Sequence, residues 1–560
     1  MPLSYEEAVA QATGPGQMFE LVPVTVNGAT VKVFKSAPPN LREFYAFGRM
    51  HADKPFVIYE DERRTYAETM AAADAVAAAL VEHFGIKKGD RVAVAMRNYP
   101  EWVIAFIAIT SIGAISVSMN AWWTEDEMDY ALEDSGATLL IADPERYERS
   151  VASAKRLGCR ILVARADGPL PEAELWQDVV TPGKALPDVT IDPDDDATIL
   201  YTSGTTGRPK GAVSTHRAIV NALMGYASRI GIEPLMREPD EITAPPENPG
   251  TILAVPLFHV TGCVPVMLGC LISGSKLVVM RKWDAEKALE MIERERITSF
   301  IGVPTQTIDM LQHPKFNDYD TSSLLQIGGG GAPPPPALMK QIDSDFKGGR
   351  PGFGYGMTET NSLGPGITGD DALAKPTSAG RIPACMEAEI RDPATFENLP
   401  VGERGEIWFK GPNLIRGYWN KPEATAETIV DGWLRTGDIG HLDEDGFIYV
   451  DDRLKDMVLR GGENIYCAEV EAAIYDHPAI HEAAVYGLPH ERLGEEVAAS
   501  IYLRDGESLT AEELQDFLRT KLAAFKVPTV IEIRTEPLPR NPAGKFLKRE
   551  LRDSMAAASA

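Results

Sequence analysis

Residues 201–213 combine glycines, hydroxyl residues and a lysine in one short segment. Glycines let backbone N–H groups converge on an anion, hydroxyls add hydrogen-bond donors, and Lys210 adds a positive charge. A Walker loop needs lysine and Ser or Thr directly after its second glycine, whereas Gly207 is followed by Arg208 and Pro209. A flexible surface turn is the alternative interpretation. The combination of residue types instead predicts a polyphosphate-binding loop of another kind.

The elements on either side of this loop can be predicted from their apolar patterns. Residues 198–201 form a short apolar run that predicts a buried strand, and residues 215–230 predict a helix because apolar residues recur at helical spacing. Between residues 60 and 300, short apolar strands alternate with amphipathic helices. This alternation predicts a layered α/β architecture.

The chain has 560 residues, which is too long for one hydrophobic core. Strand-like runs up to residue 450 indicate a small β-rich unit, and the later pattern is that of a compact α+β module in which Thr510 and Glu513 predict a capping box. We expect an α/β fold with a large N-terminal domain of layered α/β subdomains plus the small β-rich unit over residues 1–450. A hinge at 451–456 then leads to a small mobile α+β C-terminal domain over 457–560, although this charged run alone also fits a solvated turn.

Composition and charge exclude several function classes. The formal net charge of −27 argues against nonspecific binding to nucleic acid or anionic membranes, and five scattered cysteines without a CxxC pair indicate neither a disulfide framework nor a zinc site. The first residues lack the features of a signal peptide, so we expect a cytoplasmic protein. Two apolar stretches, 102–123 and 252–273, are interpreted as buried core because the first divides into helix and strand and prolines and glycines interrupt the second.

Further motifs follow the loop in a fixed order, at residues 330–333, 354–360, 417–418, 422–425, 433–438, 461–465 and 541–545. Together with residues 201–213 they resemble the acyl-adenylate-forming superfamily of acyl-CoA synthetases, peptide-synthetase adenylation domains and luciferases. The resemblance covers about residues 40 to 550 and is closest to the AMP-forming acyl-CoA synthetases. It implies ATP, Mg²⁺ and coenzyme A as cofactors, a small-molecule carboxylic acid as substrate, and a role in fatty acid or lipid metabolism. No nucleic acid partner and no membrane span are expected, and a homodimer is left open.

The resemblance also implies roles for individual residues. Lys545, Thr358, Glu359 and Lys210 would be catalytic, Glu359 and Thr205 would hold the metal, and Lys455 would be the hinge. Tyr355 would stack on adenine, and Asp438 and Arg453 would bind the ribose. Pantetheine would pass Gly461, Gly462 and Glu463. The remaining nucleotide contacts would be Thr202, Ser203, Gly204, Thr205, Thr206, Gly330, Gly331, Ala332, Pro333, Gly354 and Gly356.

The chemistry fits these roles. A carboxylate has a poor leaving group, so joining it to a thiol needs activation, which attack on the α-phosphate of ATP provides. Charge then builds on phosphate oxygens, where a metal ion and a lysine can stabilise it. Taken alone, each residue also has a plainer interpretation: Glu359 could cap a helix, Lys545 could be a solvated lysine in a basic tail, and Asp438 could close a turn.

The predicted acyl pocket is lined mostly by small, uncharged residues. Its candidate residues are His259, Val260, Cys263, Gly329 and Gly356. Acetate-specific relatives carry a tryptophan at the position matching Gly356, so we expect an open pocket and an apolar acid larger than acetate. His259 could equally be a core histidine. Medium- and long-chain fatty acids and aryl acids all remain open.

Rival activities share the adenylation step. A peptide-synthetase adenylation domain would carry an aspartate after the pocket phenylalanine, but His259 follows Phe258. A fatty acyl-AMP ligase would carry an insertion after the hinge, where residues 453–464 are contiguous. A luciferase-type enzyme stays open because it shares every motif. A nucleotide-binding regulator without catalysis is disfavoured, since the acidic and basic motif residues are all retained.

Overall fold

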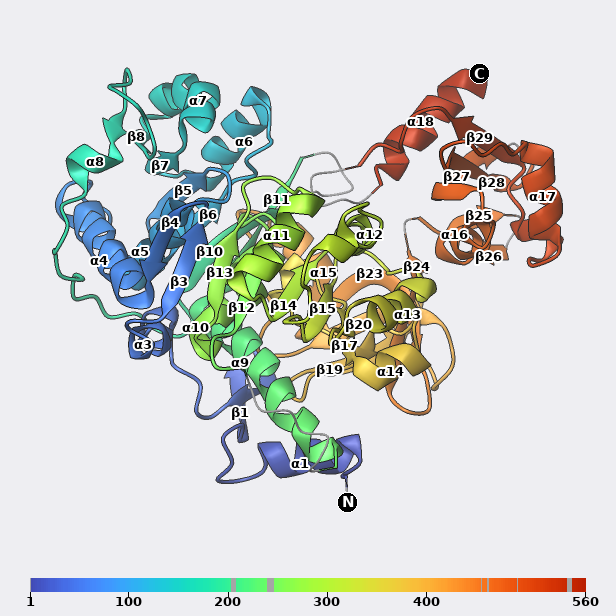
Figure 1. Cartoon of the computed structure of the whole chain (residues 1–560), viewed down its shortest axis with the longest axis horizontal. Coiled ribbons are helices and arrows are strands. Elements are labelled where there is room, and N and C mark those ends of the chain that lie inside the picture. The colour runs from blue at the N-terminus through green and yellow to red at the C-terminus, as the bar shows by residue number, and fades with distance from the viewer. Residues whose placement is uncertain are drawn as a thin grey trace.

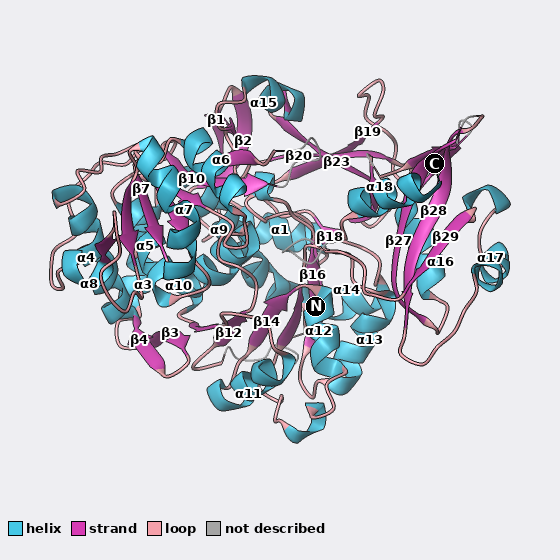
Figure 2. Cartoon of the chain, turned by 90° about the horizontal axis from the view of Figure 1, so that it is seen from above, coloured by secondary structure: helices cyan, strands magenta, loops and turns pink. Residues whose placement is uncertain are grey.

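The computed structural model describes residues 2–202, 208–238, 246–454, 456–460, 463–490, 492–540 and 546–559 (Figure 1). A large α/β body holds most of the chain, and a small unit, coloured orange to red in Figure 1, lies at one side of it. Figure 2 shows the same arrangement from above, with the strands of the small unit gathered beside the C-terminus. The α/β fold class with a large and a small domain is confirmed.

The first large sheet supplies the strands around the predicted phosphate loop. Its order is β21 (Gly417–Tyr418), β11 (Lys210–Thr215), β10 (Asp196–Thr202), β6 (Ile115–Ser118), β5 (Arg91–Ala95), β7 (Leu139–Ala142), β8 (Arg160–Val163) and β9 (Glu174–Leu175). Strands β10 to β9 run parallel, while β10, β11 and β21 pair antiparallel. The predicted strand at 198–201 is therefore confirmed, and the loop joins two hydrogen-bonded neighbours.

Helices cover both faces of this sheet, as the alternation along β5 shows. Val92 and Val94 pack into a core with α4 (Tyr66–Glu82) and α5 (Pro100–Ser111). Ala93 and Ala95 face the opposite core, with α6 (Glu125–Ser135) and α7 (Pro144–Leu157), because successive side chains point to opposite faces of a strand. Helix α5 is apolar on every side and almost wholly buried, as expected for a helix enclosed by the protein.

The second large sheet contains a parallel block and an antiparallel block. Its order is β19 (Glu387–Arg391), β20 (Gly405–Lys410), β23 (Trp433–Leu442), β24 (Phe447–Arg453), β18 (Gly380–Arg381), β17 (Gly366–Thr368), β16 (Arg350–Gly354), β15 (Gln326–Gly329), β14 (Ser299–Gly302), β12 (Gly250–Leu253), β13 (Lys276–Val279), β3 (Pro55–Tyr59) and β4 (Glu62–Thr65), with β22 (Ile429–Val430) beside β23. Strands β16 to β3 are parallel. Strands β20, β23 and β24 form the expected β-rich unit.

The main hydrophobic core lies between the two sheets. It contains α9 (His216–Ile232), the helix predicted over 215–230, together with α4, α5 and side chains of β12. A second core on the outer face of the second sheet is covered by α11 (Ala285–Glu295), α12 (Pro304–Leu311) and α13 (Pro336–Asp345). Shorter elements complete the body: α1 (Tyr5–Thr13), β1 (Leu21–Val26), β2 (Ala29–Phe34), α2 (Leu41–Phe44), α3 (Ala46–Met50), α8 (Trp176–Val179), α14 (Gly369–Ala374) and α15 (Pro422–Thr428).

The apolar stretch 252–273 divides into three pieces. It contains the second half of β12, a π-helical turn η3 (Gly262–Leu268) and α10 (Gly269–Ser273), all in or beside the main core. Within the described ranges, no helix is both long and apolar enough to cross a membrane. The interpretation of both apolar stretches as core is confirmed.

The small unit is a sheet with helices packed on it. The strand order is β26 (Glu463–Ile465), β25 (Val458–Arg460), β28 (Gly494–Leu503) and β27 (Ile480–His490), and β29 (Val530–Arg534) pairs parallel with β28. Helices α16 (Cys467–Tyr475) and α17 (Ala511–Arg519) share one core, and α18 (Lys548–Ser559) covers another. Helix α17 starts with the predicted capping box, in which Thr510 and Glu513 bond each other's backbone N–H groups.

The chain passes from the large body to the small unit through β24. Near the end of this strand the carboxylate of Asp452 accepts a hydrogen bond from the backbone N–H of Cys467 at the start of α16. The guanidinium of Arg404 lies 5.1 Å from the ring centroid of Tyr466. Burial raises the pKa of Asp452 from 3.8 to about 6, although Lys548 nearby lowers it. The junction thus contains a buried acid that is ionised at neutral pH.

This acid predicts a pH dependence of stability. Because the pKa of Asp452 is raised in the folded state, the folded chain binds a proton more readily than the unfolded chain between pH 3.8 and 6. The contribution of Asp452 to the free energy of unfolding therefore falls as the pH rises through this window. Asp452→Asn keeps an oxygen acceptor for Cys467 and should remove this loss, with an upper limit of about 3 kcal/mol at neutral pH. The difference in thermal unfolding midpoint between Asp452→Asn and wild type should be larger at pH 7.5 than at pH 5. An equal difference at both pH values would contradict the assignment.

Candidate active site

Three parallel strands of the second sheet end at one edge, and the predicted motifs at residues 330–333 and 354–360 begin at the ends of two of them. Gly302, Gly329 and Phe353 are register partners near the ends of β14, β15 and β16, so residues 330–333 and 354–356 emerge side by side. A Cβ atom at Gly329 would lie only 1.7 Å from the carbonyl oxygen of Gly302. The glycines are therefore required by the close approach of neighbouring strands. The carboxyl edge of parallel strands is where α/β proteins bind ligands.

Asp438 lies at the centre of a first polar cluster. The hydroxyl of Tyr355, just beyond β16, donates to its carboxylate, and Nε of Arg453 lies 3.4 Å from Asp438 Oδ1. Asp438 and Arg453 face each other as register partners of β23 and β24. Asp438 is only 7% exposed, and burial raises the pKa of the Tyr355 hydroxyl well above its ordinary value, which keeps it a neutral donor. The structure thus brings together the three residues predicted to bind adenine and ribose.

Glu359 lies at the centre of a second cluster. It belongs to the 3₁₀ turn η5 (Thr358–Thr360), is 6% exposed, and its Oε1 accepts a hydrogen bond of 2.7 Å from the Tyr418 hydroxyl. The Nζ of Lys210 lies 5.1 Å from the centroid of the Tyr418 ring, a cation–π arrangement. Pairing of β11 with β21 holds the lysine and the tyrosine in place. Burial, followed by the charge of Glu359, raises the pKa of Tyr418.

The two clusters are electrostatically connected through Arg453. Burial acts to lower the pKa of its guanidinium, but the charges of Asp438 and Asp456 raise it above its ordinary value, with a smaller contribution from Glu359. Three acidic groups therefore act on one arginine near the junction with the small unit. Because the acids outnumber the arginine, this region favours a ligand that brings its own cation or hydrogen-bond donors.

The candidate acyl pocket lies at the start of the π-helical turn η3. The ring of Phe258 is 5.0 Å from the ring of Trp122 in an edge arrangement and 5.0 Å from that of His259. Val260 and Cys263 are buried, and burial raises the pKa of the Cys263 thiol, so this cysteine is a neutral wall residue. π-Helical turns are frequent at functional sites. Sequence reasoning did not identify Trp122 or Arg97, whose guanidinium lies 4.6 Å from the Trp122 ring centroid.

That Gly356 leaves the acyl pocket open through its missing side chain stays a prediction. A Cβ atom at Gly356 would lie 2.1 Å from the carbonyl oxygen of Ser362. A tryptophan there would displace the backbone of the loop that carries Glu359. The variant would test the integrity of the site rather than the length of the pocket.

Several predicted site residues lie outside the described residues, namely Ser203, Gly204, Thr205, Thr206, Lys455, Gly461, Gly462 and Lys545, together with the side chain of Glu463. The ends of the first segment are described: Thr202 and Lys210 are antiparallel register partners, and the Thr202 hydroxyl lies 3.4 Å from the Lys210 carbonyl oxygen. The predicted phosphate loop therefore starts and ends at one point of the sheet. Pro333 and Ala332 follow the end of β15 in the loop that Gly331 opens with a positive φ of 85°.

The side chains present fit a magnesium ion held mainly by a substrate. In the part of the chain that the structure describes, no group of three or more His, Cys, Asp or Glu could hold a metal by itself. Glu359 is a single buried carboxylate with one oxygen bound to a neutral hydroxyl. Mg²⁺ is typically held by one or two carboxylates plus substrate phosphates, which matches this arrangement.

Comparisons with known proteins agree with the geometry. The profile of the AMP-binding enzyme family matches residues 44–419, and that of the AMP-binding enzyme C-terminal domain matches residues 469–545. A feruloyl-CoA synthase of an Amycolatopsis species is 36% identical over 493 residues, which cover 87% of this chain and 93% of that protein. The long-chain-fatty-acid–CoA ligase FadD13 of Mycobacterium tuberculosis is 35% identical over 514 residues, which cover 89% and 94%.

Solved structures show the same fold. The ATP-bound MatB of Rhodopseudomonas palustris superposes with a TM-score of 0.82 at 29% identity, covering 92% of this chain and all of that one. The expectation of an ATP-dependent, AMP-forming acid–CoA ligase is confirmed by these relatives. Since the family profile spans more than half of the chain, and relatives above 30% identity span most of it, the chain belongs to the AMP-binding enzyme family.

Proposed function

We propose that this ligase converts an apolar carboxylic acid, a medium- or long-chain fatty acid or an aryl acid, to its acyl-CoA through an acyl-adenylate. The observation that carries the proposal is the pair of acid–tyrosine clusters at the carboxyl edge of β14 to β16. One has Asp438 between Tyr355 and Arg453, and the other has Glu359 beside Tyr418 and Lys210. The first suits the adenosine part of ATP and the second suits its phosphates.

In the first half-reaction, a carboxylate oxygen of the acid attacks the α-phosphorus of ATP and the bond to the bridging oxygen breaks, so that pyrophosphate leaves. Thr358 and Lys210 would hold phosphate oxygens, and Lys545 would stabilise the charge that develops on them. Magnesium, held by Glu359 and Thr205, would supply Lewis-acid charge there. Asp438 and Arg453 would fix the ribose, which holds the α-phosphorus in line with the acid.

In the second half-reaction, the thiol sulfur of CoA attacks the acyl carbon and loses its proton, and AMP leaves with the electron pair of the broken bond. We propose that residues 461–463 then border the pantetheine channel, which requires the small unit to rotate about Lys455. The hinge would lie where β24 ends and the chain enters the small unit, which has a core of its own. A rotation between the steps lets Lys545 serve one of them only.

The acyl pocket supports an apolar substrate. Phe258, Val260 and Cys263 are apolar and buried, so a second carboxylate or an ammonium group would lose its hydration without gaining a partner. The feruloyl-CoA synthase and the long-chain-fatty-acid–CoA ligase among the relatives agree with this class. The length of acid that the enzyme accepts depends on the far end of the pocket, and turnover measured on a panel of acids determines it.

The reaction should release AMP only when an apolar acid and CoA are both present. The purified chain is assayed for AMP with acetate, octanoate, palmitate, ferulate, malonate and phenylalanine. We expect turnover on an octanoate-to-palmitate acid or on ferulate at least a hundredfold above that on malonate or phenylalanine, because a buried unpaired charge costs several kcal/mol. Fastest turnover on acetate, a dicarboxylate or an amino acid would contradict the proposed pocket.

Lys545 should act in adenylation alone. Lys545→Ala should reduce ATP–pyrophosphate exchange by about a hundredfold or more, the usual cost of losing one charge-stabilising donor. The same variant should still convert supplied acyl-adenylate and CoA to acyl-CoA at the wild-type rate. Lys521→Ala, which removes an exposed ion pair with Asp476 in the same unit, is the control. Equal loss of both half-reactions would remove the proposed role.

Glu359 should set the magnesium requirement. Glu359→Gln keeps the shape and the contact with Tyr418 but loses the charge, so the half-saturating Mg²⁺ concentration for pyrophosphate exchange should rise about tenfold or more. Tyr418→Phe is the matched variant, because it removes the hydrogen bond and keeps the carboxylate. Its Mg²⁺ dependence should move far less. An unchanged titration for Glu359→Gln would leave Glu359 with a structural role.

A further inference from the structure

The segment 541–545, which carries Lys545, connects two arms of chain that are bound to each other. Arg540 and Phe546 form an antiparallel bridge, and the N–H of Leu547 donates to the carbonyl of Pro539 at 2.9 Å. The guanidinium of Arg540 lies 4.0 Å from the centroid of the Phe546 ring. The two ends of the segment are therefore held at a fixed separation.

A buried carboxylate fastens one of these arms. Oε1 of Glu482, on β27, accepts a hydrogen bond of 2.9 Å from Arg540, and Oε2 accepts one of 2.7 Å from the backbone N–H of Leu538. Glu482 is 8% exposed, so both of its oxygens are used inside the protein. A charge-assisted hydrogen bond at a buried position holds its partners firmly, and removing one partner leaves an uncompensated charge.

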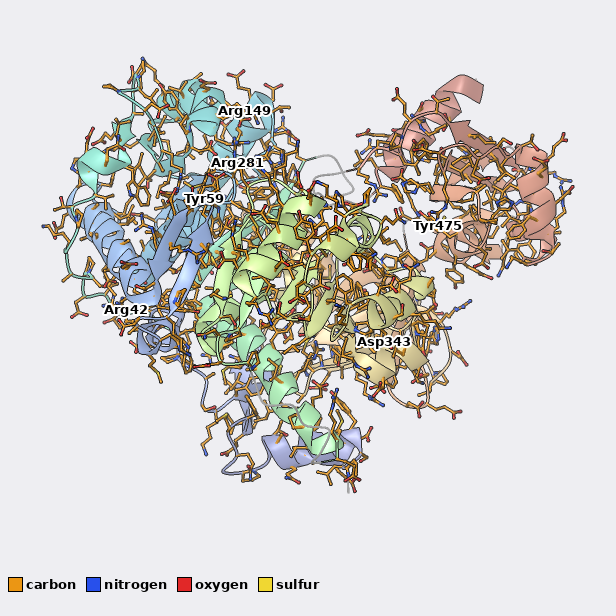
Figure 3. The ribbon with its side chains drawn as sticks, viewed as in Figure 1. Arg42, Tyr59, Arg149, Arg281, Asp343 and Tyr475 are labelled. Carbon is orange, nitrogen blue, oxygen red and sulfur yellow. The ribbon has the colours of Figure 1, made fainter. Side chains whose placement is uncertain are left out.

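The arms also rest on an apolar core. Leu538 is buried and Phe546 is half-buried against the cluster beneath α18, which includes Tyr486, Leu488 and Leu551. The neighbouring Tyr475, labelled in Figure 3, fixes β27 next to Glu482, because its hydroxyl accepts from the N–H of Ala483 at 3.0 Å. The residues on either side of the segment are thus packed into the folded small unit.

The charge of Arg540 also acts on an acid of the large body. Asp309, on α12, accepts a hydrogen bond of 2.8 Å from the indole N–H of Trp283. Burial raises the pKa of Asp309, and the charges of Arg540 and His481 in the small unit act against that rise. The same guanidinium therefore binds the small unit through Glu482 and attracts an acid of the large body.

We propose that Glu482 and Arg540 are positioning residues, which hold the segment carrying Lys545 in place for acyl-adenylate formation and take no part in thioester formation. This rests on the proposed function, in particular on the adenylation role of Lys545. The physical reason is that a lysine on a five-residue connection can reach a reacting oxygen reproducibly only if both ends of the connection are fixed. A displacement of about 1 Å is enough to cost about a hundredfold in rate.

The test compares the two half-reactions in Arg540→Met, Glu482→Gln and Arg540→Lys. Arg534→Met is the matched control, since Arg534 also pairs with a glutamate of this unit and its side chain is 27% exposed against 28% for Arg540. Pyrophosphate exchange should fall tenfold to a hundredfold in Arg540→Met and Glu482→Gln, mainly in kcat, with the KM for ATP within about threefold of wild type. Conversion of supplied acyl-adenylate should stay within about twofold.

Arg540→Lys should recover part of the exchange rate, because it restores the charge without the planar fork. The double variant Arg540→Met with Glu482→Gln should lose clearly less than the product of the two single losses, since both substitutions break the contact that the two residues share. Equal loss of both half-reactions, additive effects of the two substitutions, or the same loss in Arg534→Met would overturn the proposal in favour of a general structural role. Thermal unfolding of each variant separates misfolding from misplacement.

The outcomes also separate this inference from the proposed function. If wild type showed no acid-dependent pyrophosphate exchange, or if Lys545→Ala left exchange intact, the proposed function or the role of Lys545 would fail. If Lys545→Ala lost exchange selectively and Arg540→Met kept it, only the positioning role would fail. Selective loss in both variants supports the inference.

Discussion

The register of β23 and β24 is the constraint on which the site depends. It sets Asp438 opposite Arg453, and a few residues later the chain enters the small unit. Of the two residues that would hold the ribose, Arg453 thus belongs to the strand that leads to the proposed hinge, and Asp438 faces it from β23. A shift of one of these strands by one residue would turn its side chain to the other face of the sheet and separate the pair. The proposed ribose site and the entry into the small unit are therefore physically connected through the β23–β24 pair.

Each buried acid of the site is held by a tyrosine rather than by a cation alone. Tyr355 donates to Asp438, and Tyr418 donates to Glu359. A phenol hydroxyl satisfies one carboxylate oxygen without cancelling the negative charge, so that charge stays available for a metal ion or for ribose hydroxyls. Burial keeps both phenols protonated by raising their pKa values. The two carboxylates can therefore bind a ligand that supplies its own metal ion and its own hydrogen-bond donors.

Much of this arrangement could be predicted from the sequence, because local patterns determine it. The strand before the phosphate loop, the helix after it and the capping box at Thr510 each follow from periodicity or from one short motif. The π-helical turn η3 could not be predicted, since apolar periodicity does not distinguish it from an α-helix. The hydrogen bond from Tyr418 to Glu359 joins residues 59 positions apart and depends on the pairing of β11 with β21.

Gly356 shows how little residue size alone says about a position. A glycine in a pocket motif indicates space when its side-chain direction is open. Here that direction is filled by the backbone of Ser362, so glycine is needed for the turn that carries Glu359. Similarly, Glu482 is an ordinary acid in the sequence and becomes informative only because the fold sets it beside Arg540.

We propose that the acid is activated by forming a bond to the α-phosphorus of ATP, and the oxygen atoms of the acid can be followed to test this step. A substrate acid labelled with ¹⁸O in its carboxylate is turned over with ATP and CoA, and the nucleotide product is analysed by mass spectrometry. The account predicts AMP carrying one ¹⁸O atom from the acid, with unlabelled pyrophosphate. Label in orthophosphate together with ADP would mean an acyl-phosphate intermediate and would contradict it.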